Sequence, residues 1–216
     1  MADTIRHDTT KRHRDKYENK NLVHRLVLGR FLDALAEELK PFQDVETLDF
    51  GCGEAFFWEE MKARGVEMSR LTGIDLREDA LDVARHHFPQ HEFLCQDLLE
   101  WKTSRKFGLV VASQVLEHLP DPARFLSRLV ELTEAKGSLL LTVPWEPFFM
   151  LSNLARGRDV RRFGNHPEHV NLWSKRGFRK FVELHADVSK SESVIPFTTI
   201  IARPRNLATE KPQVGR

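Results

Sequence analysis

Three carboxylates each lie in or near the end of a short apolar segment of the chain. They are Asp49, Asp75 and Asp97. Because the carboxyl ends of parallel strands meet at one edge of a sheet, we expect these acids to lie close together at such an edge. A carboxylate at the end of the second strand can accept hydrogen bonds from both hydroxyls of a ribose, which is the chemistry that Asp75 predicts.

A pair of glycines follows the first of these acids in the stretch Gly51-Cys52-Gly53. Glycine allows the backbone to turn tightly and lets a ligand approach without meeting a Cβ. No Gly-Lys-Ser/Thr follows, so the stretch is not a phosphate-binding P-loop. Phe56 stands where a dinucleotide-binding loop would have its third glycine. The pattern therefore predicts a nucleoside ligand without phosphates.

The elements that must position these residues alternate along the chain. Short β-branched and apolar runs predict strands, and apolar residues at helical spacing predict helices between them. Such alternation is typical of right-handed βαβ crossovers and a parallel sheet covered on both faces. We expect strands at 46–50, 70–75, 91–95, 107–113 and 138–143, helices at 21–40, 54–64, 78–88, from Asp121 and after Ser174, and an antiparallel hairpin of 186–194 and 197–202.

This alternation predicts an α/β fold: a three-layer Rossmann-like sandwich with a seven-stranded, mostly parallel sheet and an antiparallel C-terminal hairpin strand. Residues 1–20 are charged and predict an N-terminal arm, residues 21–203 one domain, and residues 204–216 a flexible tail. The segment 145–172 fits neither periodicity and follows the fifth strand, where substrate lids are usually inserted. We therefore expect a helical lid there.

Composition excludes several classes of protein. Lys and Arg number 33 and Asp and Glu 32, so a broad basic surface for nucleic acid is not expected. No apolar stretch approaches the length of a membrane-spanning helix, and residues 1–20 do not resemble a secretory signal. The two cysteines, Cys52 and Cys95, form no CxxC pair, which argues against a disulfide framework or a zinc site and favours the cytoplasm.

The order of motifs resembles that of the class I S-adenosylmethionine-dependent methyltransferases across roughly residues 21–203. Thr47-Leu48-Asp49-Phe50-Gly51-Cys52-Gly53-Glu54 resembles their first motif, and Thr72-Gly73-Ile74-Asp75-Leu76 their second. The stretches 95–98, 107–122 and 137–144 are similar to the motifs that follow. One departure is Ala55, where many members keep a glycine.

This resemblance implies S-adenosylmethionine as the cofactor and a role at each matched position. Asp49 would organise the loop or meet the amino group of the cofactor, and Asp75 would hold the ribose hydroxyls. The other cofactor-binding positions implied are Gly51, Cys52, Gly53 and Gln114 at the methionine end and Leu76, Asp97 and Leu98 around the adenine. Tyr17 would cover the site from the N-terminal arm.

Histidines near this edge could accept a proton from the methyl acceptor. His118 follows the fourth strand, and His166 and His169 lie in the lid. Imidazole titrates near neutrality, so each is a candidate general base. The alternative is structural: His118 would fix the geometry of its loop, and the lid histidines would bond to backbone groups.

The lid also carries features that point to the acceptor. Arg161 and Arg162 belong to a cluster of four arginines that could pair with an anionic group, although a solvated helical face is the alternative. Trp145 starts an apolar stretch that could contact the body of the acceptor. These residues favour a small-molecule acceptor, anionic or amphiphilic, methylated on oxygen or else on nitrogen or carbon. The pattern predicts no oligomeric state.

Two other functions remain open. A macromolecule-modifying methyltransferase is one, because Glu117-His118 with a later histidine resembles, distantly, the metal-binding set of small-RNA 2′-O-methyltransferases. Those enzymes have an additional Glu where this chain has Gln114, so we predict no metal site and no nucleic-acid partner. A catalytically silent cofactor-binding module is the other.

Overall fold

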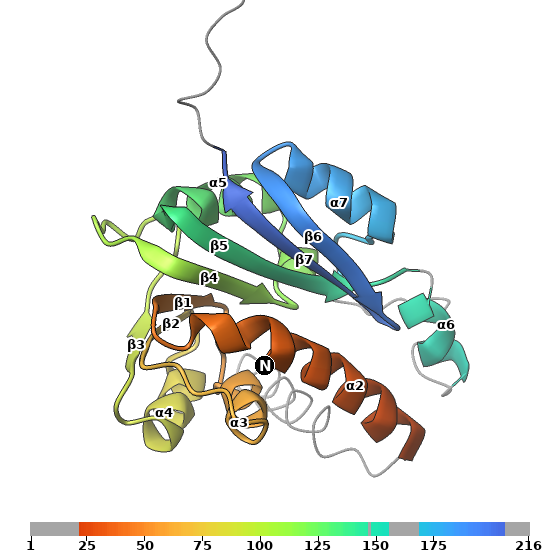
Figure 1. Ribbon diagram of the computed structural model, residues 1–216, viewed down its shortest axis with the longest axis horizontal. Helices are drawn as coiled ribbons and strands as arrows, with labels where there is room; N and C mark the ends of the chain where they lie inside the picture. The colour runs from red at the N-terminus through yellow and green to blue at the C-terminus, as the bar shows by residue number, and fades with distance from the viewer. Residues whose placement is uncertain (1–21, 147, 156–168, 206–216) are drawn as a thin grey trace, which may run out of the picture.

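The computed structural model describes residues 22–146, 148–155 and 169–205. Its centre is a seven-stranded sheet with the strand order β3-β2-β1-β4-β5-β7-β6 (Figure 1). Neighbouring strands from β3 to β5 are parallel, and β7 is antiparallel to both β5 and β6. The strands are β1 (Glu46–Phe50), β2 (Arg70–Asp75), β3 (Glu92–Cys95), β4 (Phe107–Ser113), β5 (Thr133–Pro144), β6 (Ala186–Val194) and β7 (Phe197–Pro204).

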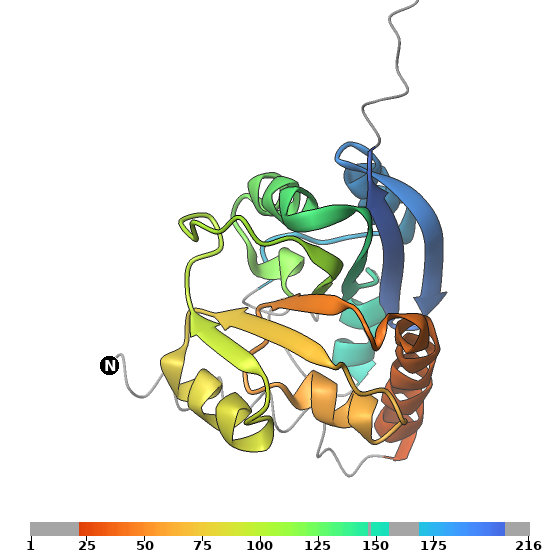
Figure 2. The same ribbon diagram turned by 60° about the vertical axis from the view of Figure 1, so that its left-hand side comes forward.

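Helices cover both faces of this sheet, which confirms the predicted α/β sandwich. Figure 2 shows α2, α3 and α4 on one side and α5 and α7 on the other. The short turns η1 and η2 precede β1 and follow β4, and α6 follows β5. The bounds are α2 (Leu22–Leu39), η1 (Lys40–Phe42), α3 (Phe56–Lys62), α4 (Glu78–His87), η2 (Leu116–His118), α5 (Pro122–Leu132), α6 (Phe148–Ala155) and α7 (Lys175–Glu183).

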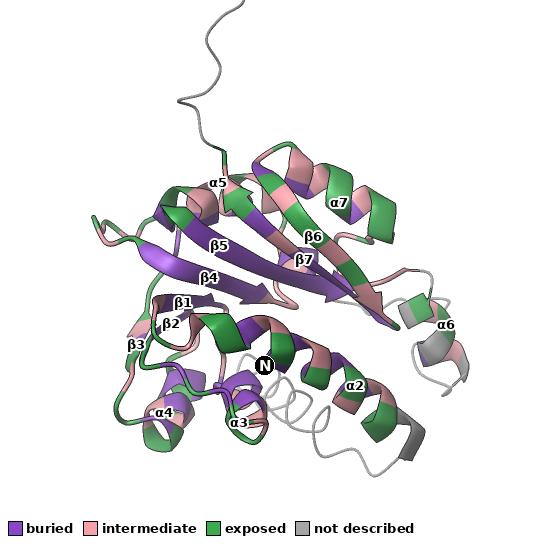
Figure 3. Ribbon diagram, viewed as in Figure 1, coloured by how far each residue is buried: buried purple, intermediate pink, exposed green. Residues whose placement is uncertain are grey.

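Side-chain alternation along the central strands divides the core into two parts. Leu109 and Val111 of β4 pack with α2, α3 and α4, whereas Val110 and Ala112 pack with α5 and α7. Because both faces are covered, β4 is apolar along its whole length, as expected of a central parallel strand. The purple strands in Figure 3 show this burial.

Two predicted element starts were wrong by two residues or more. The fifth strand begins at Thr133 rather than Ser138, because Thr133 pairs with Phe107 of β4 before an irregularity in the register; the side chains of residues 134–136 are exposed and polar or small. The helix after the glycine loop begins at Phe56 rather than Glu54, because Ala55 has a left-handed backbone with φ of 61°. The C-terminal hairpin was predicted correctly, with β7 lying between β5 and β6.

The predicted arm 1–20 lies outside the described residues, and so do most of the tail 204–216 and the lid residues 156–168. Within the described part of the lid, α6 forms the expected helix. None of the helices in the described ranges combines the length and apolar character needed to cross a membrane.

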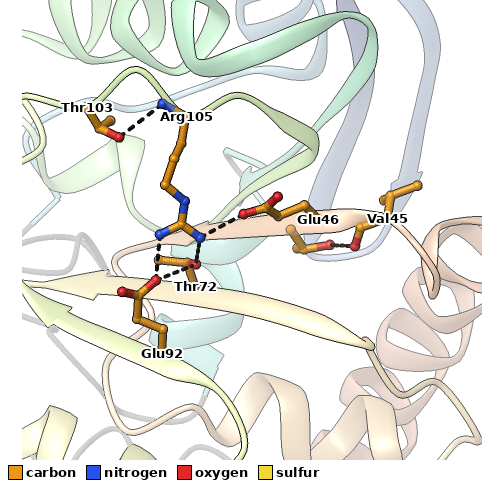
Figure 4. Close-up of polar contacts among 7 residues, drawn as sticks. Val45, Glu46, Thr72, Glu92, Thr103 and Arg105 are labelled. Atoms are coloured by element: carbon orange, nitrogen blue, oxygen red, sulfur yellow. Dashed lines mark hydrogen bonds and ion pairs between the residues drawn. The ribbon is translucent and has the colours of Figure 1, made fainter.

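A guanidinium network joins three strands near their amino ends, away from the glycine loop (Figure 4). Arg105 donates to Glu92 Oε2 at 2.6 Å, to Glu46 Oε1 at 2.7 Å and to Thr72 Oγ1 at 2.8 Å. These partners lie on β3, β1 and β2 respectively. One side chain therefore ties together the strands that carry the glycine loop and Asp75 at their other ends.

We expect Arg105→Ala to lower the free energy of unfolding by about 1–2 kcal/mol, because several charge-assisted hydrogen bonds are lost from a partly exposed site. The hydrogen bond from Arg105 lowers the pKa of Glu92 below its ordinary value. That stabilisation is therefore present above the ordinary pKa of a glutamate and is lost as pH falls through the lowered value. Urea unfolding of the wild type and of Arg105→Ala should show a difference in the free energy of unfolding that becomes smaller on acidification.

Arg179→Ala is the matched control, since Arg179 makes a helix-surface pair with Glu183 and should cost only a few tenths of a kcal/mol. An equal loss in the two variants would contradict the assigned role of Arg105.

Candidate active site

A cavity of about 530 Å³ opens at the carboxyl ends of β1, β2 and β4, beneath α2. Its polar wall comes from the glycine loop and the two strand ends beside it. Its apolar wall comes from α2 and the start of α3. The lining residues are Leu28, Phe31, Leu32, Asp49, Gly51, Cys52, Gly53, Glu54, Phe56, Phe57, Asp75, Arg77, Ser113, Gln114, Val115 and His118.

The glycine loop needs its glycines for two separate reasons. Gly51 and Gly53 have φ of 71° and 53°, in the left-handed region that favours glycine. A Cβ at Gly51 would also lie 2.6 Å from Val115 Cγ2. The backbone N–H of Gly51 donates to Ile74 O at 2.8 Å, which fastens the loop to β2. The loop thus leaves room for a ligand where side chains would otherwise fill the cavity.

Asp75 links the loop after β1 to the turn after β2 at this edge of the sheet. Its Oδ2 accepts from Gly53 N–H at 2.9 Å, and its Oδ1 accepts from Arg77 N–H at 2.9 Å. The Arg77 side chain also approaches, with Nε 3.7 Å from Oδ1. A carboxylate has about four lone-pair sites, so each oxygen can still accept a ligand hydroxyl. The carboxylate is therefore held in place and remains able to bind a ribose.

Asp49 is one of two deeply buried acids of the cavity wall, with 3% of its surface exposed. Its Oδ2 accepts a hydrogen bond of 2.7 Å from Trp58 Nε1 on α3. Burial, which is the largest effect, raises the pKa of Asp49 to about 7; the Trp58 hydrogen bond opposes that rise and the charge of Asp75 adds to it. Burial also raises the pKa of Cys52, with the charge of Asp49 adding to that effect. Asp49 can therefore change its charge near neutral pH.

Two histidines and a glutamate gather near the η2 side of the cavity. His118 Nε2 lies 3.9 Å from Glu117 Oε1. The rings of His118 and His169 meet edge to face with centroids 5.0 Å apart. One ligand atom from each of these three residues lies within 4.8 Å of the others. Imidazole and carboxylate groups are thus brought together from positions far apart in the sequence.

Hydrogen bonds from the last residues of the lid segment, which return to the sheet, hold His169 in this place. Val170 N–H and Asn171 N–H both donate to Glu117 O, at 2.8 and 3.0 Å. The Asn171 side chain donates to Leu119 O at 2.7 Å and to Leu116 O at 3.3 Å. Asn171 therefore anchors the returning segment on η2, directly beside His118.

The residues that the sequence predicted do not all line the cavity. Asp49, Gly51, Cys52, Gly53, Asp75, Gln114 and His118 line it together, and His169 lies against His118. Leu76 is 70% exposed and Leu98 lies in the core between the sheet and α5. Asp97 accepts a hydrogen bond from Leu99 N–H, and the Trp145 ring packs at a tilt against Phe148. Tyr17, Arg161, Arg162 and His166 lie outside the described residues.

Four residues around the site were not among the predicted cofactor, catalytic or substrate residues. Trp58 bonds to Asp49, Arg77 faces Asp75, Glu117 adjoins His118, and Asn171 fixes the returning chain. Glu117 was considered only with His118, in the metal-binding alternative. The others depend on contacts that the local sequence does not encode.

The chain matches the methyltransferase-domain family over residues 12–185. It belongs to that family. The resemblance to class I S-adenosylmethionine-dependent methyltransferases and the fold that it implied are thereby confirmed, and S-adenosylmethionine is the cofactor of this class of domain. The cavity fits that cofactor, because it offers a backbone cradle, a carboxylate suited to a ribose and an apolar wall.

Relatives of this methyltransferase domain include two ubiquinone biosynthesis O-methyltransferases. That of Coxiella burnetii (strain Dugway 5J108-111) is 26% identical over 154 residues, which make up 63% of this chain and 64% of the relative. That of Aromatoleum aromaticum is 35% identical over 107 residues, 44% of this chain and 42% of the relative. The match thus spans between 42% and 64% of the length of these two relatives.

A solved structure supports the fold of the methyltransferase domain. Magnesium protoporphyrin IX methyltransferase from Synechocystis PCC 6803, with bound S-adenosylhomocysteine, superimposes with a TM-score of 0.69 at 17% identity. The superposition covers 92% of this chain and 95% of that one.

We expect Asp75→Ala to weaken the binding of S-adenosylhomocysteine at least about tenfold, because hydrogen bonds to a charged group contribute about 1.5–3 kcal/mol each. Titration calorimetry at one pH measures this change. Asp79→Ala is the matched control, since Asp79 lies on the exposed side of the first turn of α4. Unchanged affinity in Asp75→Ala would remove this carboxylate from the binding site.

Proposed function

We propose that this domain transfers a methyl group from S-adenosylmethionine to an oxygen atom of a small molecule. The observation that carries the proposal is the meeting of His118 with Glu117 and His169 at a cavity that the glycine loop also lines. An oxygen acceptor must lose a proton, and imidazole is the side chain best suited to take it near neutral pH. The names of the O-methyltransferase relatives agree with an oxygen acceptor.

The chemistry asks the protein mainly for alignment and for removal of a proton. S-adenosylmethionine supplies the methyl group from a sulfonium centre and becomes a neutral thioether. Asp75 and the glycine loop hold the donor side in place, an orientation effect that can contribute up to about 7–11 kcal/mol in favourable cases. His118 Nε2 takes the acceptor proton, and the carboxylate of Glu117 at 3.9 Å stabilises the resulting imidazolium.

The described lid residues support an acceptor with an apolar part. Phe148 and Leu151 of α6 and Val170 and Leu172 of the returning chain are exposed. Large exposed apolar side chains that gather near a site often mark the surface where a ligand or partner binds. We propose an amphiphilic small molecule as the acceptor, with Trp145, Arg161, Arg162, His166 and Tyr17 kept as candidate contacts, and a cytoplasmic location for the protein.

We expect His118→Ala to lower kcat by about 10²-fold or more, since a positioned general base typically contributes about 10²–10⁴-fold. His169→Ala should lower kcat less, because His169 supports the position of His118. S-adenosylhomocysteine affinity should be unchanged in both. Release of S-adenosylhomocysteine with a panel of phenolic acceptors measures turnover.

His86→Ala is the matched control, since His86 lies on the exposed side of α4. Full activity of the His118 variant on every accepted phenol would rule out a base at this position.

A second candidate is metal-assisted methyl transfer by the same three side chains. Ligand atoms of Glu117, His118 and His169 lie within 4.8 Å of one another. Two imidazoles and one carboxylate form a ligand set that divalent transition metals prefer. A metal held there would lower the pKa of the acceptor hydroxyl. RNA ribose hydroxyls then become a possible class of acceptor beside small molecules.

Dialysis against a chelator separates the two candidates. If His118 acts as a base, turnover should be unchanged after dialysis, because no ion takes part in proton removal. If a metal acts, turnover should fall and return on addition of Mn²⁺ or Zn²⁺. The same assay with a short RNA tests whether a macromolecule is the acceptor. If S-adenosylmethionine stabilises the protein but no acceptor is turned over, a non-catalytic module is favoured.

A further inference from the structure

The charged side chains that line the cavity are mostly acidic. Asp49, Glu54 and Asp75 contribute carboxylates, and Arg77 contributes the only guanidinium among the described lining residues. Asp49 and Glu54 are each 3% exposed, so water screens their charges weakly. With all four groups ionised, the wall would carry an excess of negative charge. Such a wall favours a ligand with a net positive charge.

The two ligands that this site must bind differ by one positive charge. S-adenosylmethionine has a sulfonium, and S-adenosylhomocysteine has a neutral thioether in its place. The remaining groups, an ammonium, a carboxylate and an adenosine, are common to both. A buried carboxylate beside the ligand can therefore distinguish donor from product by charge, provided that the carboxylate can also become neutral.

Asp49 is placed to make that change. It lies in the centre of the sheet, paired in register with Gly73 of β2 and Val111 of β4, and it faces the cavity. Trp58 Nε1 donates to one of its oxygens, and a protonated carboxyl group can still accept that bond through its other lone pairs. The fold therefore tolerates both charge states of Asp49.

The neighbours of Asp49 explain why this acid, rather than another, should adjust its charge. From β2 and the turn after it, Asp75 and Arg77 face the same cavity; from the glycine loop, Cys52 and Glu54; and from η2, His118. The lining side chains of α2 are apolar. Burial and the charge of Asp75 raise the pKa of Asp49 to about 7, against the effect of the Trp58 hydrogen bond.

We propose that Asp49 is the residue by which the domain distinguishes S-adenosylmethionine from S-adenosylhomocysteine: its carboxylate is ionised when the sulfonium is bound and protonated when the thioether is bound. Binding of the donor to the protonated form releases one proton from Asp49 to solvent. After methyl transfer, the lost sulfonium charge allows Asp49 to take one proton back from solvent. No bond to Asp49 other than its O–H forms or breaks.

This inference rests on the cofactor and not on the identity of the acceptor. A ligand that requires the ionised form loses about tenfold in affinity for each pH unit below the pKa of that group. The preference for donor over product is therefore greatest above neutral pH and declines as the solution becomes acidic. Product then competes more strongly with donor at low pH.

Titration calorimetry of the wild-type protein between about pH 5.5 and about pH 7.5 tests the proposal, with about tenfold per pH unit as the limiting slope. We expect the affinity for S-adenosylmethionine to fall on acidification, while that for S-adenosylhomocysteine does not fall and rises slightly as Asp49 becomes protonated. Repeating the titrations in buffers of different ionisation enthalpy should detect proton release with the donor only. Equal pH dependence for the two ligands would overturn the proposal.

Variants separate Asp49 from the other groups that titrate in this range. Asp49→Asn keeps an acceptor for Trp58, and it should remove the pH dependence and leave product affinity unchanged. Trp58→Phe should move the loss of donor affinity to higher pH, because a hydrogen bond that lowers the pKa is gone. Asp44→Asn, an exposed matched control, should behave as the wild type.

His118 is the competing source of such a dependence, since a protonated imidazole would also repel the sulfonium. A slope that survives in Asp49→Asn and disappears in His118→Gln would overturn the proposal. If neither ligand binds the wild-type protein at any pH, the cofactor assignment itself is wrong, which is a different outcome from equal pH dependence. Thermal unfolding of each variant shows whether it is folded before it is titrated.

Discussion

The hydrogen bond from Gly53 N–H to Asp75 Oδ2 is the contact on which the rest of the site depends. It joins the loop after β1 to the end of β2, so the two crossovers that must grip one ligand are fixed relative to each other. Gly53 has a left-handed backbone, and the same carboxylate keeps lone pairs for a ribose. This hydrogen bond thus holds the ends of β1 and β2 together as one side of the binding site.

The second important property of the site is its negative charge, which water screens weakly because the acidic side chains are buried. Acidic groups outnumber the single guanidinium among the described lining residues, and the buried Asp49 has a raised pKa. A wall of this kind suits a cationic donor and releases a neutral product more readily. In the proposed mechanism the histidine side of the cavity has a different task, because an oxygen acceptor would lose its proton there. The proposal thus assigns donor recognition and proton removal to separate elements.

Much of the fold could be predicted from the sequence, since periodicity reports burial directly. The continuous apolar run of β4 indicated a central strand, and the absence of a helix between 186–194 and 197–202 indicated the hairpin. The start of β5 could not be predicted, because residues 134–136, between the paired Thr133 and Ser138, have exposed side chains and do not alternate between apolar and polar. The side-chain pattern indicates a strand only where side chains on one face are buried.

The candidate site was predictable in part for a similar reason. The glycine loop, Asp75 and His118 follow strand ends, and strand ends meet at one edge in any parallel sheet. Asn171 and the partnership of Trp58 with Asp49 were missed, because they depend on how distant segments return to that edge. Leu98 was expected beside the adenine, but its side chain is buried in the core. The sequence thus predicts which residues lie at the carboxyl edge of the sheet, but not which of them contact one another there.

The most direct test of this account is a crystal structure of the protein with S-adenosylhomocysteine bound. The account predicts that the ribose hydroxyls donate to Asp75 and that the sulfur faces the side of the cavity where His118 and His169 meet. A ribose bound away from Asp75, or a sulfur turned away from the two imidazoles, would contradict it.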